Sequence, residues 1–334
     1  MTTLEDVAKR AGVSTATVSK VLSNTPYFTE ETRAKVLHAV EELGYVPHLA
    51  ARALSSGKTG IIAVVFPFIY DTIFTDPLVM SILEGIEAEC SRQGYNILLS
   101  MPRLSPTETD ENYRQLVRSG YMDGVICLDA HPLVSAVTPF YERGIPGVSI
   151  GYHHDHFNVR SADRSGGYAL MKHLLDLGHR QIGIISVPPG MHRSIEQRIV
   201  GIRAAAEQVA LDIDRLPRRD GDFSMETGAA CAAELLDAHP ELTALLCIND
   251  RMAMGAVRQA RLMGRHIPDD LSVVGYDNIP MASVFAPPLT TVDQLAPDMG
   301  QTAASMLFEI LRGGQPDSIE MPTQLIIRHS SVAI

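Results

Sequence analysis

The chain has 334 residues, of which 46% are hydrophobic and 20% are charged, and it contains no tryptophan. This length exceeds one ordinary domain and suits two or three, and no apolar run is long enough to cross a bilayer. The net charge of −11 argues against a protein that coats nucleic acid indiscriminately. The first 58 residues differ from the rest, because they carry seven Lys and Arg against six Asp and Glu.

The N-terminal residues and the cysteines indicate the compartment. The stretch Thr2–Asp6 is acidic where a signal peptide would be basic and then apolar. Cys90, Cys127, Cys231 and Cys247 lie far apart in or beside apolar stretches, as free core thiols do in a reducing compartment. We therefore expect a cytoplasmic protein with neither a cofactor nor a metal site.

The first 45 residues show the spacing of short helices. The apolar residues of Leu4–Ala11 fall on one helix face, and Gly12 follows where that helix must end. Ser14 can cap a second helix, whose buried side is formed by the apolar residues of Val18–Leu22. Thr29 can cap a third helix. Two short helices across a tight turn, followed by a third, predict a helix-turn-helix whose second helix enters the major groove of DNA.

These residues also match a known family. Thr3–Ser14 and Thr17–Leu22 closely resemble the head of the lactose-repressor (LacI/GalR) family, and Gly44–Pro47 and Ala51–Leu54 continue the match. The resemblance implies a sequence-specific transcription regulator, usually a repressor, that binds a palindromic operator as a homodimer. It also implies control by a small-molecule effector.

The resemblance assigns the DNA contacts. It places Thr15, Ala16 and Lys20 at base edges, where the Lys20 ammonium can donate to guanine and the methyl groups can meet thymine. Phosphate contacts, which position the head without specifying a sequence, are expected from Ser14, Thr17 and Ser19. Leu54 would be wedged into the minor groove. Two alternatives stay open, namely Lys20 as a solvated cation and Leu54 as a linker residue packed on the body.

From Gly60 onward, apolar runs of strand length alternate with helical patterns. Strands are predicted at 61–66, 96–100, 124–128, 147–150, 181–186, 244–248, 271–275 and 324–328. Helices are predicted at 77–93, 107–119, 132–143, 198–210, 225–238 and 251–263. This alternation predicts an α/β body of two lobes with parallel sheets. A ligand then belongs in the cleft between the lobes, beyond the carboxyl ends of the strands.

The body resembles the same family and, behind it, the periplasmic sugar-binding proteins. The segments that match are Asp163–Tyr168, His173–His179, Arg198–Gly201, Asn249–Gly255, Leu271–Asp277 and Pro287–Gln294. The resemblance implies a helix-turn-helix domain at 1–46, a hinge at 47–59 and a ligand-binding and dimerisation body at 60–334. Within the body it implies an N-lobe of 60–160 and 292–322 and a C-lobe of 161–291 and 323–334.

The resemblance at these segments also implies which residues form the effector pocket. Arg198 would donate hydrogen bonds to ligand oxygens, Asp277 would accept from hydroxyl groups, and Asn249 and Gln294 could do either. Phe223 would lie against an apolar ring face. Further contacts are expected from Phe74, His192 and Ser194. One aromatic ring, one guanidinium and several carboxylate or amide groups suit a neutral sugar or polyol better than a phosphate.

Each pocket residue has a structural alternative. Asp277 and Asn249 end predicted strands, where they could cap the following helices. Arg198 could be a solvated helix residue, and Phe223 could be plain core.

Two motifs suggest other chemistry. Gly147–Gly151 satisfies the Gly-x-Ser-x-Gly spelling of a hydrolase nucleophile elbow, but no helical pattern follows it. The segment His153–His156 looks metal-like by composition, although consecutive residues do not converge on one ion. We expect a solvated polar loop there.

The other functional hypotheses are a sugar-binding protein without regulatory DNA binding and, third, an enzyme that uses the cleft. The absent signal peptide and the well-formed head oppose the first, and we expect no enzymatic activity. No heptad repeat follows the strand predicted at 324–328, which favours a dimer over a tetramer.

Overall fold

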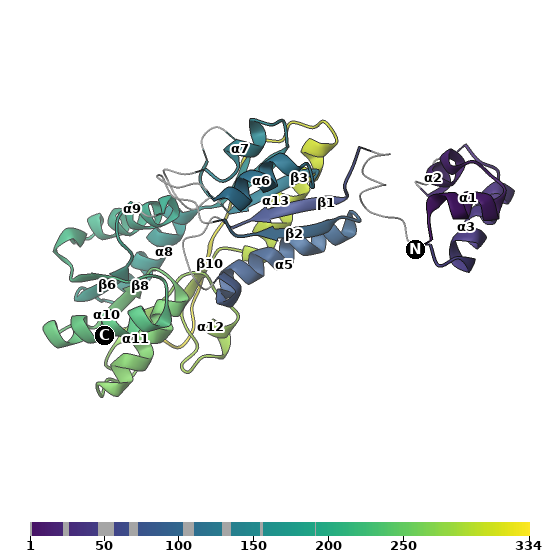
Figure 1. Ribbon diagram of the computed structural model, residues 1–334. Coiled ribbons are helices and arrows are strands. Elements are labelled where there is room, and N and C mark those ends of the chain that lie inside the picture. Colours follow the sequence, from purple (N-terminus) through teal and green to yellow (C-terminus); the bar gives the residue numbers. More distant parts are fainter. Residues whose placement is uncertain are drawn as a thin grey trace.

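The computed structural model describes residues 2–22, 27–45, 57–66, 73–102, 110–128, 135–153, 156–190 and 192–334. Leu54 and most of the predicted hinge lie outside the described residues, as do residues 67–72. Figure 1 shows a head of three helices and an α/β body built of two lobes. The predicted fold class is therefore confirmed.

Three helices form the head, namely α1 (Leu4–Ala11), α2 (Thr15–Leu22) and α3 (Glu30–Glu42). Gly12 ends α1 in the left-handed conformation, with φ at 69°. The Ser14 hydroxyl accepts the N–H of Thr17 at 3.1 Å, and the Thr29 hydroxyl accepts the N–H of Thr32 at 3.3 Å. The buried core of the head consists of Val7, Ala8, Val18, Val21, Val36, Ala39 and Tyr45.

The N-lobe contains a parallel sheet of six strands in the order β11-β5-β4-β3-β1-β2. The strands are β1 (Ile61–Val65), β2 (Asn96–Ser100), β3 (Gly124–Leu128), β4 (Gly147–Ile150), β5 (Asn158–Ser161) and β11 (Ile319–Met321). The helices are η1 (Ile73–Thr75), α5 (Pro77–Arg92), α6 (Glu111–Ser119), α7 (Thr138–Tyr141) and α13 (Ala296–Leu311).

Alternate residues of β1 show how the helices cover the sheet. Ile62 and Val64 share a core with residues of α5 and α13. Ala63 and Val65 share a second core with Tyr113 and other residues of α6 and the α7 region. Because successive side chains of a strand point to opposite faces, the sheet is covered by helices on both sides (Figure 1).

Two predicted helices of this lobe are shorter than their patterns suggested. The helix expected at 107–119 begins at Glu111, because Asp110 caps it by accepting the N–H of Asn112 at 2.8 Å. The helix expected at 132–143 is wrong in extent, since only Thr138–Tyr141 is helical in the described part. There the Ser135 hydroxyl accepts the N–H groups of Val137 and Thr138, a local turn that competes with a longer helix.

The C-lobe contains a parallel sheet of four strands in the order β7-β6-β8-β9. These strands are β6 (Ile182–Ser186), β7 (Arg218–Asp220), β8 (Ala244–Cys247) and β9 (Ser272–Val274). The helices are α8 (Asp163–Asp176), α9 (Arg193–Glu207), η2 (Ile213–Arg215), α10 (Met225–Ala238), α11 (Asp250–Leu262) and α12 (Met281–Val284). All four cysteines of the chain are buried free thiols, as the sequence predicted.

The chain passes between the two lobes three times. It passes first from β5 to α8, then from β10 (Thr291–Asp293) to α13, and last from β11 to β12 (Gln324–Ile326). β10 and β12 pair antiparallel as a two-stranded ribbon. The end of β10 therefore lies beside the start of β12, so this ribbon holds two of the three crossings next to each other.

Three helix pairs of the body cross closely because each partner contributes a glycine. The pairs are Gly85 of α5 with Gly300 of α13, Gly167 of α8 with Gly201 of α9, and Gly228 of α10 with Gly255 of α11. A Cβ atom placed at Gly201 would lie 1.9 Å from the carbonyl oxygen of Arg164 on α8. Such an atom meets backbone, which cannot swing away, so the two helices would have to separate.

We expect Gly201→Ala to lower the free energy of unfolding by about 1–3 kcal/mol, as overpacked cores do. This outcome reverses the gain of up to about 1 kcal/mol that alanine normally brings to a helix interior. Urea unfolding followed by circular dichroism measures the change, with Glu207→Ala on the exposed face of α9 as the control. A stabilised Gly201→Ala variant would contradict the close crossing.

Candidate functional site

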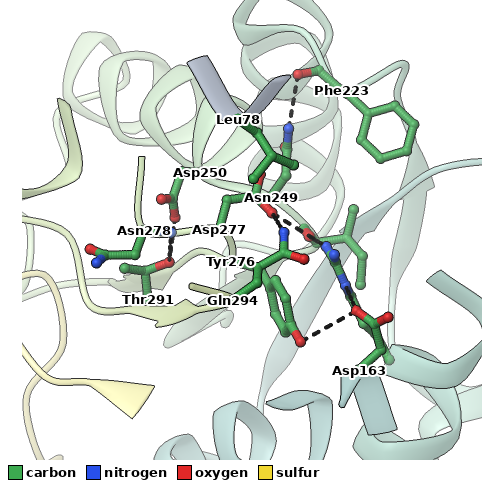
Figure 2. A network of polar contacts seen from close by, with 12 residues as sticks. Leu78, Asp163, Phe223, Asn249, Asp250, Tyr276, Asp277, Asn278, Thr291 and Gln294 are labelled. Atoms are coloured by element: carbon green, nitrogen blue, oxygen red, sulfur yellow. Dashed lines mark hydrogen bonds and ion pairs between the residues drawn. The ribbon is translucent and has the colours of Figure 1, made fainter. Parts of the chain in front are cut away.

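Three of the expected pocket residues follow the carboxyl ends of neighbouring strands. Asn249 comes two residues after β8, Asp277 three after β9, and Gln294 directly after β10. All three are buried. The Gln294 amide donates to Asp277 Oδ1 at 2.6 Å, so residues 17 positions apart meet side by side (Figure 2). Asp277 accepts this bond and caps no helix, since no side chain caps the following α12.

Arg198 on α9 joins the same cluster from the side. Its Nε atom donates to Asp163 Oδ1 at 2.8 Å, and Nη1 donates to the carbonyl oxygen of Ile248 at 2.8 Å and lies 3.6 Å from Asp277 Oδ1. The guanidinium also lies 3.7 Å from the centre of the Tyr276 ring. Because Arg198 is only 5% exposed, the alternative of a solvated helix residue is wrong.

Asp163 and Tyr276 are site residues that the sequence reasoning did not single out. Tyr276 donates its hydroxyl to Asp163 Oδ1 at 3.4 Å, which closes a triangle with Arg198. Gly166 makes room for this arrangement, since a Cβ atom there would lie 2.2 Å from the Tyr276 hydroxyl oxygen. No local pattern could have marked Asp163 as the partner of Arg198, because the two residues are 35 positions apart and the burial of Arg198 is seen only in the fold.

The charges of the cluster offset one another. Burial raises the pKa of the Asp277 carboxyl well above its usual range, although the guanidinium of Arg198 lowers it. Burial alone would lower the pKa of Arg198, but Asp163, Tyr276 and Asp277 together raise it. The guanidinium is therefore charged and already neutralised by carboxylates of the protein.

Asn249, Phe223 and His192 form a second side of the site. Asn249 Oδ1 accepts the N–H of Met252 at 3.0 Å, so the helix-cap alternative holds for this residue. Its amide nitrogen donates to the carbonyl oxygen of Phe223 at 3.1 Å. Phe223 has a left-handed backbone, with φ at 70°, and its half-buried ring meets the ring of His192 edge to face at 5.2 Å.

The other two expected pocket residues are less closely tied to the cluster. Ser194 is half-buried in the first turn of α9. Phe74 lies in η1 and is 57% exposed, and no ring contact found within the described ranges joins it to the cluster.

The start of α5 contacts the C-lobe beside the cluster. Asp76 caps α5 by accepting the N–H of Leu78, and its other oxygen lies 3.2 Å from Arg251 Nη1 at the start of α11. Both charged side chains are about four-fifths buried. Leu78 contacts the cores of both lobes and appears beside Asn249 in Figure 2. The first turns of α5 and α11 therefore hold the lobes together by charge and by apolar contact.

Asp250, at the start of α11, contacts β10 and the segment that leads to it from β9. Its carboxylate accepts the Thr291 hydroxyl at 2.5 Å and the N–H of Ile279 at 2.9 Å. Burial raises the pKa of Asp250 to about 7, although these two hydrogen bonds oppose the shift.

The raised pKa of Asp250 predicts a pH-dependent stability. Asp250 binds its proton more tightly in the folded protein than in the unfolded chain, so the bound proton stabilises the fold. This stabilisation is complete below the pKa of Asp250 in the unfolded chain and is lost as pH rises through about 7. We expect the wild type to lose about 2 kcal/mol relative to Asp250→Asn between pH 5 and pH 8. Urea unfolding at four pH values measures the difference, with Asp237→Asn on the surface as the control. Parallel pH profiles of the wild type and Asp250→Asn would contradict the assignment.

The second helix of the head presents the expected DNA-contacting residues. Thr15, Ala16 and Lys20 are exposed on α2, whereas Val18 and Val21 on its other side are buried. Ser14 is exposed, and Thr17 and Ser19 are half-buried. Leu54 lies outside the described residues, so its expected contact remains a prediction.

The alternative motifs do not form catalytic or metal sites in the described residues. Ser149 is fully buried in β4, and the described residues 151–153 and 156–157 that follow are not helical. The loop is not simply solvated as expected, since His153 bonds to Ser135 and the His156 ring stacks on Tyr141. No group of three metal-ligating side chains occurs in the part of the chain that the structure describes.

Comparisons with known proteins agree with this geometry. Residues 3–48 match the family model of bacterial regulatory proteins of the lacI family, and residues 171–331 match that of a periplasmic binding protein-like domain. The HTH-type transcriptional regulator DegA of Bacillus subtilis (strain 168) is 34% identical over 99% of this chain and 98% of its own length. The chain belongs to the lacI family. This lacI-family protein is therefore a DNA-binding transcriptional regulator whose body has the fold of small-molecule-binding proteins.

Solved structures show the same architecture. A lac repressor dimer bound to operator and the anti-inducer ONPF aligns with a TM-score of 0.86 and 26% identity, over 99% of both chains. The regulator CelR in complex with cellobiose aligns with a TM-score of 0.71 and 29% identity, over 99% of this chain and 100% of its own. Among the described residues of this lacI-family regulator, no helix combines the length and apolarity that crossing a bilayer requires.

Proposed function

We propose that this regulator binds a palindromic operator as a homodimer and is controlled by a neutral sugar or polyol held between its lobes. It acts in the cytoplasm, most often as a repressor, and binds its effector without chemical turnover. Thr15, Ala16 and Lys20 contact base edges and Leu54 enters the minor groove. Phosphate contacts come from Ser14, Thr17 and Ser19.

The observation that carries the effector proposal is the neutralised polar cluster. Arg198 is shared between Asp163 and Asp277, so its charge is not free to attract a phosphate. Asp277 and Gln294 offer an acceptor and a donor beside each other. A hydroxyl group of a sugar both donates and accepts hydrogen bonds and carries no charge. A buried site with neighbouring donors and acceptors and no net positive charge therefore suits such groups.

The aromatic residues support the same ligand class. Phe223 and His192 form an edge-to-face pair next to Asn249, and both belong to the C-lobe. An aromatic ring can cover the apolar face of a pyranose or furanose while the amides and carboxylates bind its hydroxyls. We assign Arg198, Phe223, Asn249, Asp277 and Gln294 to the ligand, with Phe74, His192 and Ser194 as further contacts. CelR, a structural relative, was solved with cellobiose.

The homodimer is supported by exposed apolar side chains on the body. Met281 and Val284 of α12 are 52% and 76% exposed, and Leu262 of α11 is 76% exposed. A partner subunit that covered these side chains would remove them from water, whereas single exposed apolar residues also occur on monomers. The lac repressor dimer bound to operator gives a structural precedent for pairing.

One pair of experiments tests the proposal. Duplexes selected from a random library by the full-length protein should share an inverted repeat, and binding should weaken steeply with salt. A thermal-shift panel of ribose, glucose, cellobiose and xylitol should raise the melting temperature with at least one compound. The same compound should change the affinity for the selected duplex. A protein that binds a sugar but no inverted repeat would be the binding protein without regulatory function, and conversion of the bound sugar would reveal an enzyme.

A further inference from the structure

A cavity lies between the lobes, and none of its lining residues belongs to the cluster around Arg198. Its volume is about 430 Å³, within the size range of small-molecule sites. The N-lobe lines it with Tyr152, Arg160 and Glu320, and the C-lobe lines it with Arg164, Ser165 and Gln197. A molecule that fills this cavity touches both lobes.

The cavity and the effector cluster use different sides of the same helices. Arg164 and Ser165 of α8 follow Asp163, whose carboxylate is buried against Arg198. Gln197 of α9 directly precedes Arg198. Neighbouring residues of a helix point about 100° apart, so the residues that line the cavity face away from the buried ion pair. Arg164 and Ser165 are exposed, as a ligand contact requires.

The N-lobe wall of the cavity is held in place by the sheet. Arg160 and Glu320 are register partners on β5 and β11, and Arg160 Nε donates to Glu320 Oε2 at 3.1 Å. Arg160 Nη1 donates to Asn158 Oδ1 at 3.0 Å, and the guanidinium lies 5.7 Å from the centre of the Tyr152 ring. The charges of Arg160 and Glu320 in this wall therefore offset each other.

The C-lobe wall supplies the excess charge. Arg164 forms no ion pair within the described parts of the chain, whereas Arg160 is matched by Glu320. The neutral neighbours Ser165 and Gln197 can both donate hydrogen bonds. The cavity thus has one unmatched guanidinium and several donors in a protein whose net charge is −11.

We propose that this cavity binds a small oxyanion, a metabolite that carries carboxylate or phosphate groups, between the two lobes. Arg164 is its main ligand, because a guanidinium binds either group through two parallel hydrogen bonds. Ser165 and Gln197 donate further bonds from the C-lobe, and the Arg160 side chain bounds the ligand on the N-lobe. The lining of this site includes none of the residues assigned to the sugar, although Tyr152 in its wall also interacts with Asp163 beside Arg198.

Calorimetric titration of the full-length protein with citrate and with pyrophosphate tests the site, at an ionic strength held constant with sodium chloride. We expect saturable binding of one anion per chain. Citrate as the tighter ligand assigns carboxylate chemistry to the site, and pyrophosphate as the tighter ligand assigns phosphate chemistry. Arg164→Gln should weaken the tighter ligand at least tenfold, and Gln197→Ala should weaken it several-fold.

The matched control is Arg143→Gln, which removes an exposed arginine of the N-lobe outside the cavity. It changes the net charge by the same amount and should leave the anion affinity unchanged. Equal affinities of Arg164→Gln and the wild type would overturn the proposal, because the anion would then bind elsewhere. Equal losses in Arg164→Gln and Arg143→Gln would overturn it as well, since they indicate general charge attraction. Failure of both anions to bind at millimolar concentration also rejects the site.

Discussion

Replacing Arg198 with alanine is expected to lower the free energy of unfolding of the body by about 3–5 kcal/mol, the cost of breaking a buried ion pair from one side. The substitution leaves Asp163 with the hydroxyl groups of Tyr276 and Tyr152 and leaves Asp277 with the amide of Gln294. It also removes the donor to the Ile248 carbonyl oxygen. Urea unfolding of the wild type and Arg198→Ala at pH 7 measures the loss.

The loss should depend on pH with a defined sign. Without the guanidinium, burial raises the pKa of both carboxyls further, so the folded variant binds protons more tightly than the unfolded chain. The variant therefore loses stability as pH rises, and the gap to the wild type should be wider at pH 8 than at pH 5. Arg203→Ala, which breaks the exposed pair with Asp214, is the control and should cost several times less. A similar cost for both variants contradicts the buried network.

Replacing Asp277 with alanine is expected to weaken effector binding by about tenfold to a hundredfold, the cost of 1.5–3 kcal/mol for a lost hydrogen bond to a charged group. The ligand loses its acceptor, and the Gln294 amide loses the partner that orients it. Calorimetry with the sugar or polyol that stabilises the wild type most strongly measures the affinity. Binding to the selected operator duplex should persist, because the head folds around its own core.

Asp237→Ala is the matched control, since it removes an exposed carboxylate of α10 from the same lobe. Its effector affinity should equal that of the wild type. If Asp277→Ala binds the effector as tightly as the control does, the ligand site lies elsewhere. If Asp277→Ala loses operator binding in the absence of effector, the residue acts on folding or pairing instead.

The local patterns in the sequence were sufficient for the elements of the fold. Period-3.6 spacing in Leu4–Ala11, a glycine at position 12 and capping hydroxyls at Ser14 and Thr29 all act within one helical turn, so the head could be predicted without tertiary contacts. The strands at 96–100, 124–128 and 147–150 have the bounds that were predicted. Each is a fully or partly buried apolar run between turn residues.

Predictions failed where a local turn or a packing partner decides the outcome. Within the described residues 135–143, the helix expected at 132–143 covers only Thr138–Tyr141, because Ser135 holds the preceding backbone in a turn. The capping role of Asn249 is local and was open in the sequence, but its bond to the Phe223 carbonyl needs the folded chain, since these two residues are 26 positions apart.

The sequence by itself determined the head, the alternation of strands and helices, and the family to which the chain belongs. Those features depend on hydrophobic periodicity, helix-capping residues and short sequence motifs, which are local properties of the chain. Only the tertiary structure decided that Arg198 is neutralised by Asp163 and Asp277, that paired glycines let the helices cross closely, and that a cavity between the lobes opens beside Arg164. The ion pairs and the glycine pairs join residues 27 to 215 positions apart, and local patterns carry no information on which distant side chains compensate a buried charge.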